Sequence, residues 1–286
     1  MERKLVKQGD VTLMVSLPSK WIKHNSLKQG DAVHIEIKDD NSLNITGKGT
    51  STVKSIELTV TKDALRTAIA SAYKAGYEEI VLHSDVSLEE INIILMSFTG
   101  LEIVMQGKGN YTLKSFLSQT DTDTEKLILK LFQLTKYVAD MTWNEWQTAN
   151  IQEMKTLVKL NTMKLRDHCL RMIHLHGYGG DKTYDYYDFV TVLEKTAAAY
   201  YALTNDIVSK KVKKNQIAQE LILQLDALYK SYMARDFAAT ENIRIHLQKS
   251  IFVSIGKLKD ASFQMHCYYI YQLSLHLTSR ILSLSC

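Results

Sequence analysis

Apolar and other residues alternate at every second position in two stretches of the first forty-six residues. The first stretch runs from Leu13 to Leu17 and the second from Val33 to Ile37. This period of two is typical of β-strands that bury one face. The apolar residues at 43–45 predict a further strand. The chain is therefore expected to begin with short strands, each with one buried side.

The only proline of the chain lies between these two stretches. Pro18 has no N–H group to donate to a neighbouring strand, so the first strand should end there. Residues 19–27 then predict a short helix, and Gln29-Gly30-Asp31 predicts a turn before the next strand. About 48 residues of short strands bury too little apolar surface to be stable alone. We therefore expect this segment to form a homodimer.

Strand and helix patterns alternate between residue 55 and about residue 116. The predicted strands are residues 56–60, 78–84, 101–107 and 111–116, and the predicted helices are residues 63–75 and 88–98. Asp63 and Ser87 are the expected N-caps, and Gly76 and Gly100 lie where the helices should stop. Gly107-Lys108-Gly109 favours a hairpin turn over a nucleotide-binding loop. The pattern predicts a small α/β layer.

Residues 122–286 contain no proline and show the spacing of three and four that is typical of amphipathic helices. The clearest apolar series begin at Leu127 and at Phe263. Breaks near residues 149–150, 177–181, 210–214, 234–237 and 259–260 divide this region into about six helices. Six helices allow an arrangement in two groups of three. The fold class is thus multidomain α+β, with domains at residues 1–48, 53–117 and 122–286.

The net charge is concentrated at the start of the chain. Of the 35 basic and 31 acidic side chains, six basic and two acidic ones lie in the first thirty residues, which accounts for the whole net charge of +4. The composition, 45% apolar and 23% charged, excludes general disorder. No apolar run reaches membrane-spanning length and no signal peptide is recognised, so a cytoplasmic protein is expected.

Five basic residues in the opening segment are the candidates for contact with double-stranded DNA: Arg3, Lys4, Lys7, Lys20 and Lys23. Release of counterions from phosphates supplies much of the affinity of proteins for DNA, and contacts to bases add specificity. Lysines that only keep a small hairpin soluble are the alternative interpretation.

The opening segment resembles the swapped-hairpin DNA-binding module of the AbrB, SpoVT and MazE type. The resemblance covers residues 2 to about 46 and is based on KLVKQGD, VTLMVSLPSKW and LKQGDAVHIEI, with the spacing from LPSKW to LKQGD as its most specific part. In that family two protomers exchange hairpins into one β-barrel. The resemblance implies a dimer in which the basic residues lie near phosphates or bases.

The rest of the chain is similar to archaeal regulators that join an AbrB-like module to a PhoU-like helical bundle. LRTAIASAYKAGYEEIVL and LMSFTGLEIVM carry this similarity. PhoU bundles bind metal clusters through acidic pairs one helical turn apart. Here Glu194 is followed by Ala198 instead of an acid, and Lys159, Asn161 and Met163 occupy the corresponding part of the second helix. We therefore predict no metal and no other cofactor.

Other candidate chemistry is weaker. The three cysteines, Cys169, Cys267 and Cys286, are far apart and favour buried thiols over a disulfide framework. His168, His174 and His176, with Asp181, could share a metal only if the helix had already ended. The lysines at 210–214 are interpreted as a solvated junction, with auxiliary phosphate contact as the alternative. No nucleotide-binding or hydrolase motif occurs, so we predict no enzyme activity.

These patterns predict a homodimeric DNA-binding regulator, linked through its family resemblance to phosphate uptake or homeostasis. The helical bundle would sense a signal or dock a phosphate-signalling partner. The main alternative is a PhoU-like adaptor that modulates a phosphate transporter or signalling partner and uses the opening segment only for dimerisation. An antitoxin is a third interpretation, but it leaves about 240 residues without a role.

Overall fold

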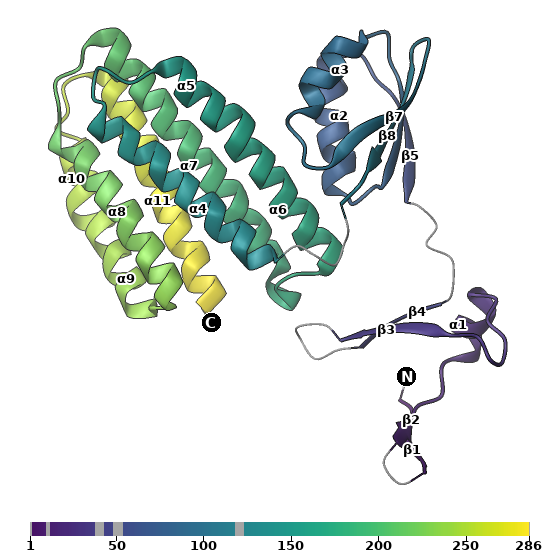
Figure 1. The fold of residues 1–286 in the computed structure, drawn as a ribbon. Coiled ribbons are helices and arrows are strands. Elements are labelled where there is room, and N and C mark those ends of the chain that lie inside the picture. Colours follow the sequence, from purple (N-terminus) through teal and green to yellow (C-terminus); the bar gives the residue numbers. More distant parts are fainter. Residues whose placement is uncertain (1, 10–11, 38–42, 48–53, 118–122, 286) are drawn as a thin grey trace. The chain divides into compact units, whose positions relative to one another are not determined.

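The computed structural model describes residues 2–9, 12–37, 43–47, 54–117 and 123–285 of the 286-residue chain. The fold is mixed α+β, with short strands and a small sheet in the first part and helices in the second (Figure 1). The chain divides into two compact units, residues 1–54 and residues 55–286.

The described residues of the first unit form two antiparallel hairpins and one short helix. Its elements are β1 (Val6–Gln8), β2 (Thr12–Met14), α1 (Ser19–His24), β3 (Val33–Ile37) and β4 (Leu43–Gly47). Helix α1 begins directly after Pro18, as expected, and Gly30 has a positive φ of 92° in the predicted turn. Strand β1 pairs with β2 and β3 pairs with β4. These described strands of one chain form two separate hairpins, not a closed barrel.

The second unit begins with a four-stranded sheet and two helices. Its elements are β5 (Ser55–Thr59), α2 (Lys62–Lys74), β6 (Glu79–His83), α3 (Leu88–Leu95), β7 (Leu101–Gly107) and β8 (Asn110–Ser115). The strand order is β5-β6-β8-β7, with β5 and β6 parallel and the other pairs antiparallel. Leu65 and Ile69 of α2 and Ile91 of α3 share a buried core with Ile80 and Leu82 of β6. The predicted α/β layer is confirmed.

Two predicted ends of these helices were wrong. Helix α2 begins at Lys62 with Thr61 as its N-cap, so Asp63 lies in the first turn, where its charge is favourable to the helix dipole. Helix α3 ends at Leu95, earlier than the expected Phe98. The N-cap at Ser87 is confirmed: its side chain accepts a hydrogen bond from the backbone of Glu90, whose side chain bonds the backbone of Ser87 in return.

In the described residues from 123 to 285, all regular elements are helices. They are α4 (Thr124–Asn144), α5 (Ile151–Thr156), α6 (Met163–His176), α7 (Thr183–Lys210), α8 (Gln216–Ala234), α9 (Phe237–His246), α10 (Phe252–Ile255) and α11 (Ala261–Ser285). Segments of π-type helix at Leu157–Thr162 and Leu247–Ile251 join α5 to α6 and α9 to α10. The described chain therefore has six continuous helical runs here, which confirms the predicted breaks.

The six runs form two groups of three. Helices α4, α6 and α7 pack on one another, as do α8, α9 and α11, and the groups meet where α7 packs on α11 and α4 on α8 (Figure 1). The second run of each group contains the π-type segment. None of the described helices combines the length and the apolar character needed to cross a membrane.

The small sheet layer is joined to the bundle where α2 packs against α6. The buried guanidinium of Arg171 donates to the backbone carbonyls of Tyr73 and Tyr77 at the end of α2, at 2.5 and 3.0 Å. A side chain at Gly76 would meet Leu175 of α6 at 2.5 Å, and Gly76 has a φ of 78°. Glycine at this position therefore permits both the end of α2 and its close approach to α6.

Candidate nucleic-acid interface

The five predicted DNA-binding side chains all lie on the surface of the first unit. Arg3 and Lys4 precede β1, Lys7 lies in β1, and Lys20 and Lys23 belong to α1. The two lysines of α1 are three residues apart and are therefore neighbours on the helix surface. All five are exposed, and none forms an ion pair with another described residue.

Large apolar side chains of the first unit are also exposed. None of its residues whose burial is described is buried. Eight such side chains are 43% to 73% exposed: Leu5, Val6, Leu13, Met14, Val15, Ile35, Ile37 and Leu43. The single chain therefore leaves exposed the Leu13 and Val15 face that the period of two predicts to be buried. The described hairpins of one chain lack a second layer that could cover that face.

The strand register shows that both faces of the first hairpin are apolar. Lys7 lies opposite Leu13, and Val6 lies opposite Met14. Directly opposed residues in an antiparallel pair project to the same face, and successive residues project to opposite faces. Leu13 therefore belongs to one face, with Lys7 beside it, while Val6 and Met14 belong to the other. A ribbon of this kind needs cover on both sides.

The second hairpin has a continuous apolar face. Ile35 lies opposite Ile45, and Ile37 lies opposite Leu43. Ile37 and Leu43 are among the most exposed apolar side chains of the unit, at 73% and 58%. Along each strand, the residues of this apolar face alternate with residues of the opposite face. This is the pattern of a sheet that packs on another layer.

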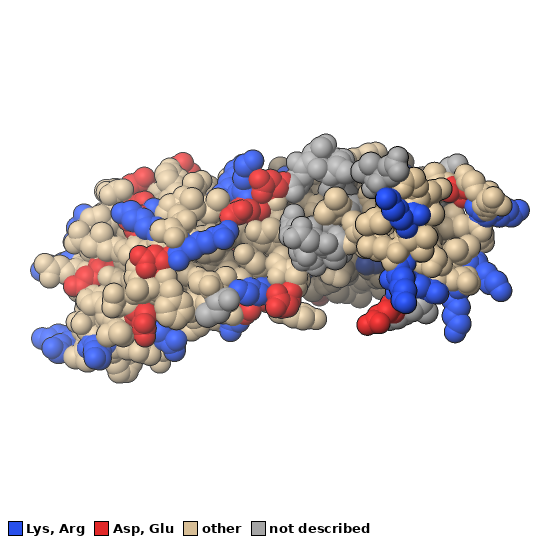
Figure 2. All heavy atoms as spheres, turned by 90° about the horizontal axis from the view of Figure 1, so that it is seen from below, with Lys and Arg blue, Asp and Glu red and all other residues tan. Residues whose placement is uncertain are grey.

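Charges are distributed differently over the bundle. Basic side chains project from the first unit at the right of Figure 2, whereas basic and acidic ones are mixed over the bundle at the left. In the lysine run at 210–214, Lys210 forms an ion pair with Asp206 at 2.7 Å, and the ammonium of Lys214 lies 4.1 Å from the centre of the Trp143 ring. These contacts support the interpretation of the run as a structural junction.

Two of the candidate metal residues, His168 and Glu194, have other partners. His168 is buried and its Nδ1 lies 3.2 Å from the hydroxyl of Tyr73, which donates to the carbonyl of Thr99 at 2.9 Å. Burial, with a smaller contribution from Arg171, lowers the pKa of His168 to about 4. Glu194 accepts from Arg166 at 2.9 Å. Within the described ranges, no three or more His, Cys, Asp or Glu side chains are grouped as metal ligands.

The two cysteines in the described part of the chain are buried free thiols. They are Cys169 in α6 and Cys267 in α11. Burial raises the pKa of Cys267 to about 12 and raises that of Cys169 as well. Both therefore stay protonated and unreactive near neutral pH, as predicted. Cys286 lies outside the described residues.

Comparison with known proteins finds no relative of this chain. A scan against protein-family models, a search of curated proteins and a search of solved structures each find no match. The function is therefore inferred from the residues of this chain and from their placement.

Proposed function

We propose that the chain is a homodimeric regulator that binds double-stranded DNA through its first unit. Two copies of this unit would interlock as an AbrB-like swapped-hairpin barrel, and the helices would act as a PhoU-like sensor or as a docking site for a phosphate-signalling partner. One observation carries the proposal. The first unit exposes eight large apolar side chains and the five candidate basic ones, which form no described ion pair, and none of its residues with described burial is buried.

The apolar side chains support a dimer. Burial of one Leu, Ile, Val or Met side chain contributes about 1.5–3 kcal/mol, so eight could contribute on the order of 10–20 kcal/mol. Association of two chains costs about 4–15 kcal/mol in lost freedom. Because both copies contribute eight such side chains, their combined burial exceeds this cost. An interlocked partner also covers both faces of the β1-β2 ribbon, which one flat partner surface would not do.

The basic side chains support DNA as the ligand. Exposed cations that have no acidic partner can each replace a counterion on a phosphate. Two copies bring ten such side chains, Arg3, Lys4, Lys7, Lys20 and Lys23 twice, to one assembly. Lys7 shares its face with Leu13, so its long stem would have to extend past the partner chain to reach a phosphate. Arg3, Lys4 and the two lysines of α1 are freer to do so.

The helical part would respond to a signal by changing how the paired first units meet DNA. The second unit is well packed, and Arg171 and His168 join its sheet layer to its helices. A signal bound to the sheet layer or the helices could therefore act on the unit as a whole. A link to phosphate uptake follows only from the family resemblance.

A salt titration of DNA binding by the full chain tests the proposal. If each copy neutralises about four phosphates, the logarithm of the binding constant should fall with the logarithm of salt concentration with a slope of roughly −7. Fluorescence anisotropy on two unrelated duplexes gives this slope. A dimer that shows no salt-dependent binding to either duplex would contradict the proposal and favour the adaptor alternative.

A further inference from the structure

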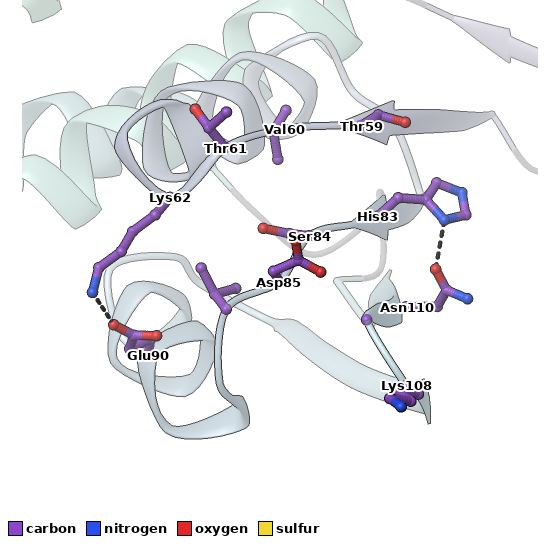
Figure 3. Close-up of a pocket in the computed structure, with 12 residues that line it drawn as sticks. Thr59, Val60, Thr61, Lys62, His83, Ser84, Asp85, Glu90, Lys108 and Asn110 are labelled. Atoms are coloured by element: carbon purple, nitrogen blue, oxygen red, sulfur yellow. Dashed lines mark hydrogen bonds and ion pairs between the residues drawn. The ribbon is translucent and has the colours of Figure 1, made fainter.

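An open cavity of about 770 Å³ lies at one edge of the small sheet (Figure 3). The parallel strands β5 and β6 end there, and the loop between β7 and β8 closes one side. In sheets with parallel strands, ligands are commonly bound in the crevice beyond the carboxyl ends of the strands. The volume is in the range of small-molecule sites. The residues that matter here are Thr61, Lys62, Ser84, Asp85, Lys108 and Asn110.

The first turn of α2 faces this cavity without a side-chain cap. Thr61 is the N-cap, but its side chain makes no capping hydrogen bond. Helix α3 begins nearby and differs, because Ser87 and Glu90 form a complete capping box. The free N–H groups and the positive dipole end of the 13-residue α2 favour an anion.

A buried serine that lines the cavity provides an independent observation. Ser84 is 8% exposed and lines the cavity, and its Oγ has no hydrogen-bond partner in the described part of the chain. Figure 3 shows Ser84 between Thr61 and Asp85. Its backbone N–H is satisfied by the carbonyl of Gly109 at 2.9 Å. A buried hydroxyl without a partner is unfavourable unless something else bonds to it.

The charges around the cavity are of both signs. Lys62 forms an ion pair with Glu90, and Lys108 lies on the β7-β8 loop. Asp85 is exposed, and its carboxylate lies close to Gly109. A bare anion would gain from the lysines and the helix end but would also meet these carboxylates. A ligand with an anionic group at one end and hydroxyl groups at the other would satisfy both sets.

We propose that this cavity binds a small phosphomonoester that carries hydroxyl groups. Its phosphate would accept hydrogen bonds from the first turn of α2, from Ser84 Oγ and from Lys62. Its hydroxyl groups would donate to the carboxylate of Asp85 and to the side-chain oxygen of Asn110, which also bonds His83 at 2.6 Å. The site does not depend on DNA binding or on the first unit.

Isothermal titration of the full chain with ribose 5-phosphate tests the proposal. We expect binding that is at least tenfold tighter than the binding of inorganic phosphate, and no binding of ribose. Ser84→Ala should weaken the binding of ribose 5-phosphate at least tenfold. Asp85→Asn should bring its affinity close to that of inorganic phosphate.

Ser115→Ala is the matched control. Ser115 also has an Oγ that is buried without a partner, but it lies at the opposite end of β8 from Asn110 and does not line the cavity. Both serine variants should melt at or above the temperature of the unmodified chain in the absence of ligand, so lost binding would not reflect unfolding.

Three results would overturn the proposal. They are no binding of either phosphate compound at 10 mM, unchanged affinity in Ser84→Ala, and equal affinity for ribose 5-phosphate and inorganic phosphate. Because each is a direct measurement of small-molecule binding, none bears on whether the first unit binds DNA.

Discussion

The two units of the chain differ in whether their apolar side chains are buried. In the second unit, apolar side chains are buried in two clusters, one in the sheet layer and one in the helical bundle. In the first unit, apolar side chains of the same kinds alternate along the strands but remain exposed. The pattern that predicts burial is thus present in both, but only the second unit contains the layers that satisfy it. The first unit's stability should therefore depend on a partner, and the second unit's should not.

The largest effect is expected in the core of the second unit. Phe189 of α7 is fully buried and packs against Phe132 and Tyr232 at ring distances of 5.9 and 5.0 Å. Phe189→Ala should lower the free energy of unfolding by about 3–5 kcal/mol. Urea titration at several protein concentrations measures this. The loss should be the same at every concentration, and a loss that varied with concentration would contradict the idea that this unit is stable within one chain.

The junction between the sheet layer and the bundle should be sensitive to pH. His168 has a pKa of about 4 in the folded chain, below its usual value of 6.5. The unfolded chain therefore takes up a proton first as pH falls, and the fold should lose about 2–3 kcal/mol between pH 6.5 and 4. The change in unfolding free energy over this range should be smaller in His168→Gln. An equal change in both proteins would show that His168 is not responsible.

The starts of α2 and α3 allow a better matched comparison, with smaller expected effects on stability. Ser87→Ala removes the capping box of α3 and should cost about 1 kcal/mol. Thr61→Ala removes an N-cap side chain that makes no capping bond, so it should change stability by only a few tenths of a kcal/mol. Thermal unfolding of both variants checks this. Equal losses would indicate that Thr61 does cap α2.

The smallest effect concerns the charges of the first unit. Lys4→Ala removes one cation from each copy, so the salt slope should become less steep by roughly 2. Lys213→Ala removes an equal charge from an exposed position in the second unit and should leave the slope unchanged. Anisotropy titrations at four salt concentrations separate the two. Equal changes in both variants would argue against a localised DNA surface.

The sequence predicted most elements because local patterns decide them. The strands from β3 to β8, the start of α1 after Pro18, and the five breaks between helical runs all followed from periodicity, proline and turn residues. The N-cap of α2 was misplaced by two residues because Thr61 and Asp63 are both good N-cap residues. Leu13 and Val15 were expected to be buried because periodicity indicates a face to be covered but not which chain covers it.

The cavity at the sheet edge was missed for a different reason. Ser84 and Thr61 are 23 positions apart, and only the parallel pairing of β5 with β6 brings the ends of these strands together. Gly107-Lys108-Gly109 was correctly predicted as a hairpin turn, and that interpretation gave no reason to join it to distant polar residues. A polar residue shortly after the end of each of two parallel strands is the signal that could have indicated the site.

The molar mass of the full chain in solution tests most directly whether two copies associate through their first units. Analytical ultracentrifugation should give twice the chain mass of 32.6 kDa. Leu13→Asp, which places a charge on the apolar face of β2, should give the mass of one chain. Thr148→Asp adds the same charge to an exposed position of the second unit and should remain a dimer. A single-chain mass for the unmodified protein, or a dimer that survives Leu13→Asp, would contradict the proposed assembly.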